Sequence, residues 1–182
     1  MRVIGVVGLP ASGKGEISKI ARGRGIPVVV MGDVIRDTVK EAGLAPTDEN
    51  FGAVADRLRA EEGMDAIANR CVAAIVQQGT PLVLIDGIRG DAEVRVFQGK
   101  FPGFVLVAID SSFEQRLERL GTRGRSDDVT SAAALRVRDE RERRWGLEAA
   151  LAMADIRIRN DGTLAEYTDA VHGLLDRLER DA

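Results

Sequence analysis

The sequence predicts an α/β protein in which helices cover both faces of a five-stranded parallel sheet. Five short apolar runs alternate with longer segments of helical periodicity, and four of these runs are rich in Val and Ile with little polar alternation. Such runs fit strands that are buried on both faces, and their alternation with helices indicates repeated βαβ units. The expected strands are Val3–Val7, Pro27–Met31, Leu82–Ile85, Phe104–Ile109 and Ile156–Ile158.

The segments between these runs predict the helices. The expected helices run from about Gly13 to Arg24, Asp33 to Lys40, Phe51 to Glu61 and Met64 to Gln78, with a polar turn over Ala45–Asn50. Asp33 is the expected cap of the second helix, which should stop near Gly43. Towards the C-terminus, apolar residues recur at helical spacing and predict a helix that packs on the core. These residues are Leu164, Tyr167, Val171, Leu174, Leu175 and Leu178.

Composition indicates one globular domain over residues 1–182, with 45% hydrophobic and 30% charged residues. A net charge of −3 and 4% aromatic residues argue against a nucleic-acid surface. No apolar run approaches the ~20 residues that a membrane helix needs. The N-terminus leads directly into the strand predicted at Val3–Val7 and the loop that follows, so we expect no signal peptide. Cys71, the only cysteine, is expected in a helix core, which suits a cytoplasmic setting.

The stretch GLPASGKGE follows the first apolar run and precedes the first expected helix. Gly8, Gly13 and Lys14 fit the spacing G-x-x-x-x-G-K of a phosphate-binding loop. Glycines let the backbone curl inward, and the N–H groups of a helix N-terminus bind a polyphosphate together with the lysine. A glycine-rich turn with an ordinary surface lysine is the alternative. The predicted nucleotide contacts are Gly8, Leu9, Pro10, Ala11, Ser12, Gly13, Lys14, Gly15 and Glu16.

Two further motifs follow apolar runs, where open α/β sheets bind ligands. Asp86 ends a buried run, and an acid there is expected to orient Mg²⁺ or to cap a turn. Arg89 lies three residues later and is a candidate phosphate ligand. Asp33 and Arg36 follow the second run, where Arg36 either holds an acceptor phosphate or is a surface residue of a capped helix.

An arginine-rich span runs from Arg116 to Arg144. Arg119, Arg123 and Arg125 adjoin a Gly-rich stretch, and we expect them to neutralise charge during phosphoryl transfer. The span from Arg136 to Arg144 alternates bases with acids, which favours a solvated, salt-bridged helix.

These elements, in this order, resemble a P-loop kinase of the nucleoside monophosphate kinase type. The loop G-x-P-x-x-G-K-G is similar to that of adenylate kinases, and Gly32-Asp33 with Arg36 and Asp86-Gly87 with Arg89 resemble their acceptor-binding elements. The tail from Ala154 to Leu164 resembles the ending of dephospho-coenzyme A kinases. The whole chain most resembles archaeal kinase-like ATPases related to both.

The resemblance implies a three-layer P-loop NTPase fold with a short lid over Gly121–Ala134. It also implies ATP as donor, Mg²⁺ held at Asp86, and a base-side contact from Asn160. Glu16 stands where adenylate kinases carry a Thr that touches phosphate, and Ile88 alone replaces their Phe-Pro. These departures set this chain apart from an ordinary adenylate kinase.

The expected activity is transfer of a phosphoryl group from ATP to a small phosphate-bearing or hydroxyl acceptor. Lys14, Asp33, Asp86, Arg119, Arg123 and Arg125 are the candidate catalytic residues, and Asp33, Arg36 and Arg89 the candidate acceptor ligands. Asp33 would serve as base for a hydroxyl acceptor. Both a nucleoside monophosphate and dephospho-coenzyme A remain open as acceptors. A nucleotide-dependent switch or RNA-associated ATPase is the alternative function.

Overall fold

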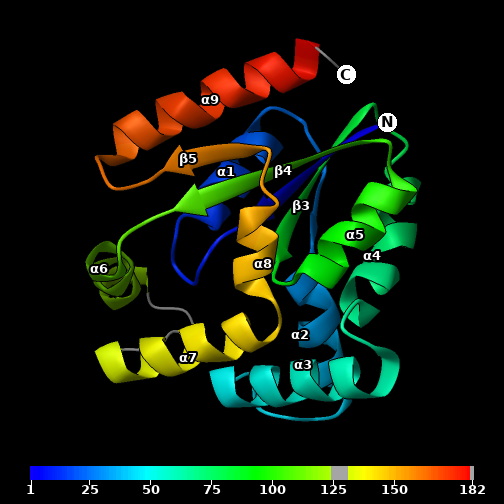
Figure 1. Cartoon of the computed structure of the whole chain (residues 1–182), viewed down its shortest axis with the longest axis vertical. Helices are drawn as coiled ribbons and strands as arrows, with labels where there is room; N and C mark the ends of the chain where they lie inside the picture. The colour runs from blue at the N-terminus through cyan, green and yellow to red at the C-terminus, as the bar shows by residue number, and fades with distance from the viewer. Residues whose placement is uncertain (124–130, 181–182) are drawn as a thin grey trace.

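A single parallel sheet organises the chain, whose computed structural model describes residues 1–123 and 131–180 (Figure 1). Its five strands lie in the order β2-β3-β1-β4-β5, and every neighbouring pair is parallel. The predicted α/β fold is therefore confirmed. The strands are β1 (Arg2–Val7), β2 (Val28–Val30), β3 (Leu82–Ile88), β4 (Gly103–Asp110) and β5 (Ile156–Arg159).

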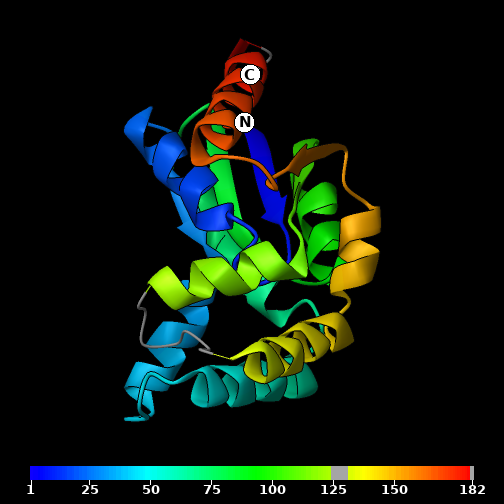
Figure 2. The same cartoon turned by 90° about the vertical axis from the view of Figure 1, so that its left-hand side faces the viewer.

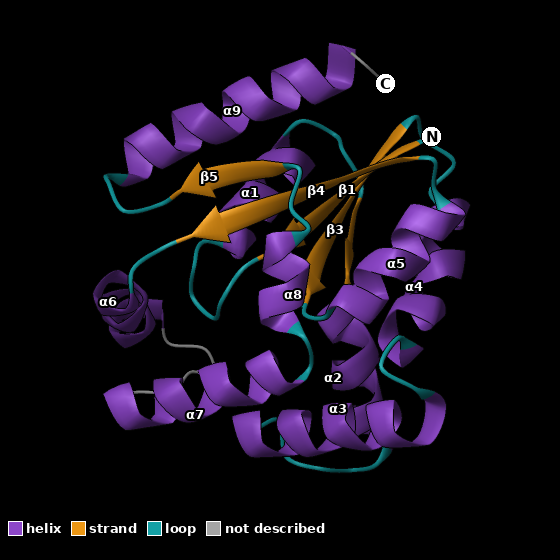
Figure 3. Ribbon diagram, in the orientation of Figure 1, coloured by secondary structure: helices purple, strands orange, loops and turns teal. Residues whose placement is uncertain are grey.

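The helices form a layer on each face of the sheet and a group beyond the carboxyl ends of the strands (Figure 3). On one face lie α1 (Lys14–Gly23) and α9 (Leu164–Arg180), and on the other α4 (Ala66–Gln77), α5 (Asp91–Lys100) and α8 (Leu147–Ala152). The remaining helices are α2 (Met31–Glu41), α3 (Asp48–Glu62), α6 (Phe113–Arg123) and α7 (Ala132–Arg144). In both Figure 1 and Figure 2, α7 lies alongside α3 and below α6.

The position of the central strand β1 explains why its sequence does not alternate between apolar and polar residues. Val3 and Val7 join the cluster under α4 and α5, whereas Ile4 and Val6 join the cluster under α1 and α9. All four side chains are fully buried. Because successive residues point to opposite faces and both faces are covered, the buried positions of this strand after Arg2 need apolar residues.

Several predicted boundaries were wrong. Met31 begins α2 rather than ending the second strand, so Val30 is its cap and Asp33 lies in its first turn. The strand β3 runs on to Ile88 through a bulge opposite Val6 and Val7. Thr47 caps α3, and three residues of the predicted polar turn are therefore helical. The local sequence pattern did not distinguish between neighbouring residues that could each begin the helix.

The range predicted for the lid overlaps the ends of two helices. The residues Gly121–Arg123 end α6, and Ala132 begins α7, so both ends of the predicted range are helical. Residues 124–130, including Arg125, lie outside the described part of the chain.

The C-terminal stripe packs as expected, except that Leu164 is 66% exposed. Within residues 1–123 and 131–180, no helix is long and apolar enough to cross a bilayer.

Candidate active site

The Gly8–Glu16 loop joins β1 to α1 in the middle of the sheet, and its glycines are needed for close approach. A Cβ on Gly8 would meet the Ile109 carbonyl oxygen at 2.7 Å. Gly13 has φ 112°, and a Cβ there would lie 2.2 Å from Asn160 Nδ2. The loop therefore has a compact form in which the first turn of α1 follows Gly13 directly, as in helix N-termini that bind anions.

Gly13→Ala is expected to remove nucleotide binding and to destabilise the chain by about 2–4 kcal/mol, because the strained φ and a clash with the Asn160 side chain, whose amide donates to the Ser12 carbonyl, add. Gly23→Ala is the matched control, since a Cβ at Gly23 meets nothing within 4 Å. Calorimetric ATP titration and urea unfolding measure both effects. Equal behaviour of the two variants would contradict this account of the loop.

The Lys14 side chain folds back onto the Gly8–Glu16 loop. Its ammonium donates to the carbonyl oxygens of Gly8 at 2.5 Å and Leu9 at 2.9 Å. Burial lowers the pKa of Lys14 to about 8, although the carboxylates of Glu142 and Asp86 raise it. An ammonium has three donors, so one N–H beyond these two bonds is available for a phosphate.

Asp86 has a partner that the sequence analysis missed. Its carboxylate accepts a hydrogen bond of 2.7 Å from Ser18 Oγ, on the second turn of α1. Gly87 follows with φ 100°, a conformation that favours glycine, at the bulge of β3. The hydroxyl supplies the partner that a partly buried acid needs. The spacing of Ser18 from the loop, one turn after Lys14, was the available signal.

Asn160, Tyr167 and Arg119 brace the loop from outside. The Asn160 amide donates to the Ser12 carbonyl at 2.9 Å, and Tyr167 Oη donates to the Gly13 carbonyl at 3.1 Å. Arg119 donates to the Asn160 carbonyl at 2.7 Å and approaches the Ser12 carbonyl at 3.4 Å. Arg119 thus contacts the loop backbone as well as the cleft. Among these residues, Tyr167 had been interpreted only as core packing.

One cleft of about 1620 Å³ brings most of the predicted site residues together. The loop from Pro10 to Glu16 lies on its wall with Asp86, Arg119 and Asn160, and the same wall continues to Asp33, Arg36 and Arg89. The lining carries eight Lys or Arg and three Asp or Glu residues, although the chain has a net charge of −3. The cleft therefore concentrates positive potential where anionic ligands would bind. The side chains of Arg123 and Arg125 lie outside the described residues.

Two arginines of the cleft wall, Arg36 and Arg89, are paired with acids. On α2, Arg36 Nε donates to Asp33 Oδ1 at 2.9 Å, and both side chains are about half exposed. Arg89 forms an ion pair of 2.8 Å with Glu142, a residue of α7 that is 1% exposed. Asp33 is therefore already paired with a guanidinium on its own helix.

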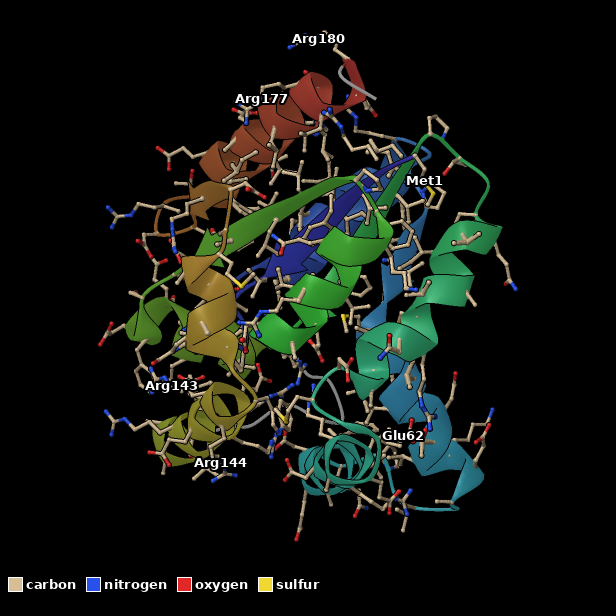
Figure 4. All side chains as sticks on the ribbon, turned by 45° about the vertical axis from the view of Figure 1, so that its right-hand side comes forward. Met1, Glu62, Arg143, Arg144, Arg177 and Arg180 are labelled. Atoms are coloured by element: carbon tan, nitrogen blue, oxygen red, sulfur yellow. The ribbon has the colours of Figure 1, made fainter. Side chains whose placement is uncertain are left out.

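The span Arg136–Arg144 is a salt-bridged helix as predicted, but the prediction that it is solvated was wrong for one of its faces. Arg138, Asp139 and Glu142 are buried, and Arg138 lines the cleft. Arg143 and Arg144 lie at the outer edge, as Figure 4 shows. The buried residues of α7, Leu135, Arg138, Asp139 and Glu142, recur at helical spacing and therefore form one face. The alternation of positive and negative residues along the sequence did not reveal this face.

Glu16 lies on the cleft wall, where its carboxylate pairs with Lys19 at 3.4 Å. This pair reduces the repulsion that a carboxylate beside a phosphate loop would cause.

The donor set near Asp86 fits Mg²⁺ better than a metal bound wholly by protein. No group of three or more His, Cys, Asp or Glu side chains that could hold a metal occurs within the described ranges. Asp86 nevertheless offers a carboxylate beside Lys14 and Ser18. Mg²⁺ commonly binds through one or two carboxylates, phosphate oxygens and water.

Comparison with known proteins agrees with this geometry. The sequence profile described as "AAA domain" matches residues 7–136. A protein of Methanoregula boonei named "UPF0200 protein" is 67% identical over 181 residues, which cover 100% of both chains. The chain belongs to the UPF0200 family.

Solved structures support the fold of this UPF0200 chain. A dephospho-CoA kinase from Campylobacter jejuni superposes with a TM-score of 0.62 at 13% identity, covering 100% of this chain and 99% of that one. A shikimate kinase from Bacteroides thetaiotaomicron gives 0.61 at 14% identity and 98% coverage of each chain. The UPF0200 chain therefore has a P-loop kinase-like fold.

Proposed function

We propose that the protein is an ATP-dependent phosphotransferase that acts on a small anionic acceptor. One observation carries this proposal: Lys14 and Asp86 line the same basic cleft as Arg36 and Arg89. A nucleotide-binding loop alone would suit many ATPases. Additional arginines in the same cleft suit the binding of an acceptor beside the donor.

In this mechanism the loop amides and Lys14 hold the donor phosphates, and Asp86 with Ser18 would hold Mg²⁺. The metal, when bound, neutralises phosphate charge. An acceptor oxygen forms a bond to the γ-phosphorus while the bond from phosphorus to the bridging oxygen breaks, and ADP leaves with that electron pair. Lys14 counters the negative charge spread over the transferred oxygens, and Arg36 and Arg89 hold the acceptor. Arg119 donates to carbonyl groups of the donor loop and lines the cleft beside it.

The acceptor class determines the role of Asp33. A hydroxyl acceptor must lose its proton, and Asp33, on the cleft wall beside Arg36, is the base in that case. A monophosphate acceptor is already ionised and needs no base. A nucleoside monophosphate, as for adenylate kinase-type enzymes, and dephospho-coenzyme A both fit these two roles.

A nucleotide-dependent switch or RNA-associated ATPase is the second candidate function. Glu16 favours it, because a carboxylate on the wall beside the phosphate loop would slow transfer to an anionic acceptor. Slow hydrolysis of ATP without stimulation by any acceptor would support this alternative.

The direct test is ADP production from Mg·ATP with AMP, CMP, UMP, GMP or dephospho-coenzyme A, beside a control without acceptor. Stimulation by one acceptor supports the kinase and names its substrate class. A flat panel, with ATP binding shown by calorimetry, contradicts transfer to these acceptors and favours the second candidate.

Asp86→Asn is expected to lower kcat by about 10²–10³-fold, because the metal loses its charged protein ligand. ATP affinity measured without Mg²⁺ should stay within about threefold, since the amide retains the shape and a bond to Ser18. Asp37→Asn, on the exposed side of α2, is the control and should leave both quantities unchanged. Full activity of Asp86→Asn would exclude a metal role.

A further inference from the structure

Arg89 is held in place by three residues that the proposed mechanism does not use. Its backbone N–H donates to Glu93 Oε2 at 2.7 Å, and its guanidinium pairs with Glu142 at 2.8 Å. The guanidinium carbon also lies 5.7 Å from the centre of the Trp145 ring. A long, flexible side chain is thereby restricted at both ends, which lowers the entropy that it would lose on binding a ligand.

The surrounding arginines do not form another anion site. A hollow of about 60 Å³ adjoins the cleft near Trp145, and several arginines line it. Each principal arginine there already faces an acid: Arg59 pairs with Glu93 at 2.8 Å, and Arg141 pairs with Asp48 at 2.8 Å. Because these charges are matched, the cluster fixes the positions of side chains and backbone more than it attracts an anion.

Glu142 is a buried acid that lies against the side chains of two arginines of the cleft wall. It is 1% exposed, and besides Arg89 it lies 3.5 Å from Arg138 Nε. Burial opposes its charge, but Arg89, Arg138 and Lys14 together hold the pKa of Glu142 below its usual range. An ionised carboxylate can therefore stay in this position at neutral pH.

The helix that carries Glu142 is also tied to the donor loop. One turn earlier, Asp139 accepts two hydrogen bonds from Arg116, at 2.9 and 2.7 Å. Arg116 in turn donates to the Pro10 carbonyl at 3.1 Å. One face of α7 thus contacts two arginines: Arg116, which donates to the donor loop, and Arg89, the proposed acceptor ligand.

We propose that Glu142 is a positioning residue, which orients Arg89 so that its remaining N–H groups bind an anionic group of the acceptor. The inference rests on the proposed function for the identity of the ligand. It adds that acceptor affinity depends on a carboxylate of α7 that touches neither substrate. Arg89, with 28% of its side chain exposed, presents its open side to the cleft.

The test uses Trp145, the only tryptophan, as reporter and inorganic phosphate as probe. The donor loop is first saturated with Mg·ADP, so that added phosphate reports on the acceptor site. Parent protein should show a saturable change in emission. Glu142→Gln keeps the size of the side chain but not its charge, and should weaken phosphate binding about tenfold, as expected for a loss near 1.4 kcal/mol. Mg·ADP affinity should stay within about twofold.

Glu140→Gln is the matched control, because Glu140 is exposed on the same helix. Glu142→Asp retains the charge on a shorter side chain, and should give intermediate phosphate affinity and serve as the test if Glu142→Gln does not fold. Equal phosphate affinity in the parent and the Glu142 variant, an equal loss of Mg·ADP affinity, or no phosphate response in the parent would each overturn the proposal. A flat acceptor panel with the expected phosphate results would instead refute only the proposed kinase function.

Discussion

Lys14→Met is expected to abolish ATP-dependent turnover and to increase stability near neutral pH. The lysine supplies the point charge for the donor phosphates, and its removal should lower kcat/KM by at least about 10³-fold. Its ammonium is partly desolvated, and burial lowers its pKa to about 8. A buried charge of this kind costs folding free energy, so loss of function and gain of stability should occur together.

The pH dependence of stability identifies the cause. Between pH 8 and the ordinary lysine pKa of 10.5, the unfolded chain binds more protons at this site than the folded chain. Parent stability from Lys14 therefore rises with pH across this window, and the advantage of Lys14→Met, about 1–2 kcal/mol at pH 7, should shrink there. Urea unfolding at pH 7 and pH 10 measures it. A constant difference would show that desolvation of Lys14 is not the reason.

Asp139→Asn is expected to be strongly destabilising. Arg116 and Asp139 are both almost completely buried and form a bidentate pair. Removing one charge leaves the other uncompensated, at a cost of about 3–5 kcal/mol. ATP affinity should fall as well, since Arg116 also holds the Pro10 carbonyl.

Two comparisons isolate that effect by urea unfolding and ATP titration. Arg143 pairs with Glu148 on the surface, so Arg143→Met should change stability by no more than about 1 kcal/mol. The double variant Arg116→Met with Asp139→Leu removes both charges and should recover most of the stability but not the ATP affinity. If Asp139→Asn unfolds at the same urea concentration as the parent, the buried pair does not stabilise α7.

The sequence by itself determined the sheet and the loop at its centre. Strands buried on both faces need continuous apolar runs, and a tight phosphate loop needs glycines at Gly8 and Gly13, so both leave marks within a few neighbouring residues. The carboxyl ends of parallel strands meet at one edge, which is why residues after separate runs, such as Asp86 and Arg36, could be assigned to one cleft.

Only the tertiary structure decided which charges are buried and what they hold. Ser12 and Asn160 are 148 residues apart, and Ser18 and Asp86 are 68 apart, yet each pair is hydrogen bonded. Arg138, Asp139 and Glu142 looked like members of a solvated helix, but all three are buried. Their partners are Asp48 of α3, Arg116 of α6 and Arg89 after β3. A charged residue becomes buried when a partner from another element compensates its desolvation, and such partners are set by packing across the fold and not by neighbours along the chain.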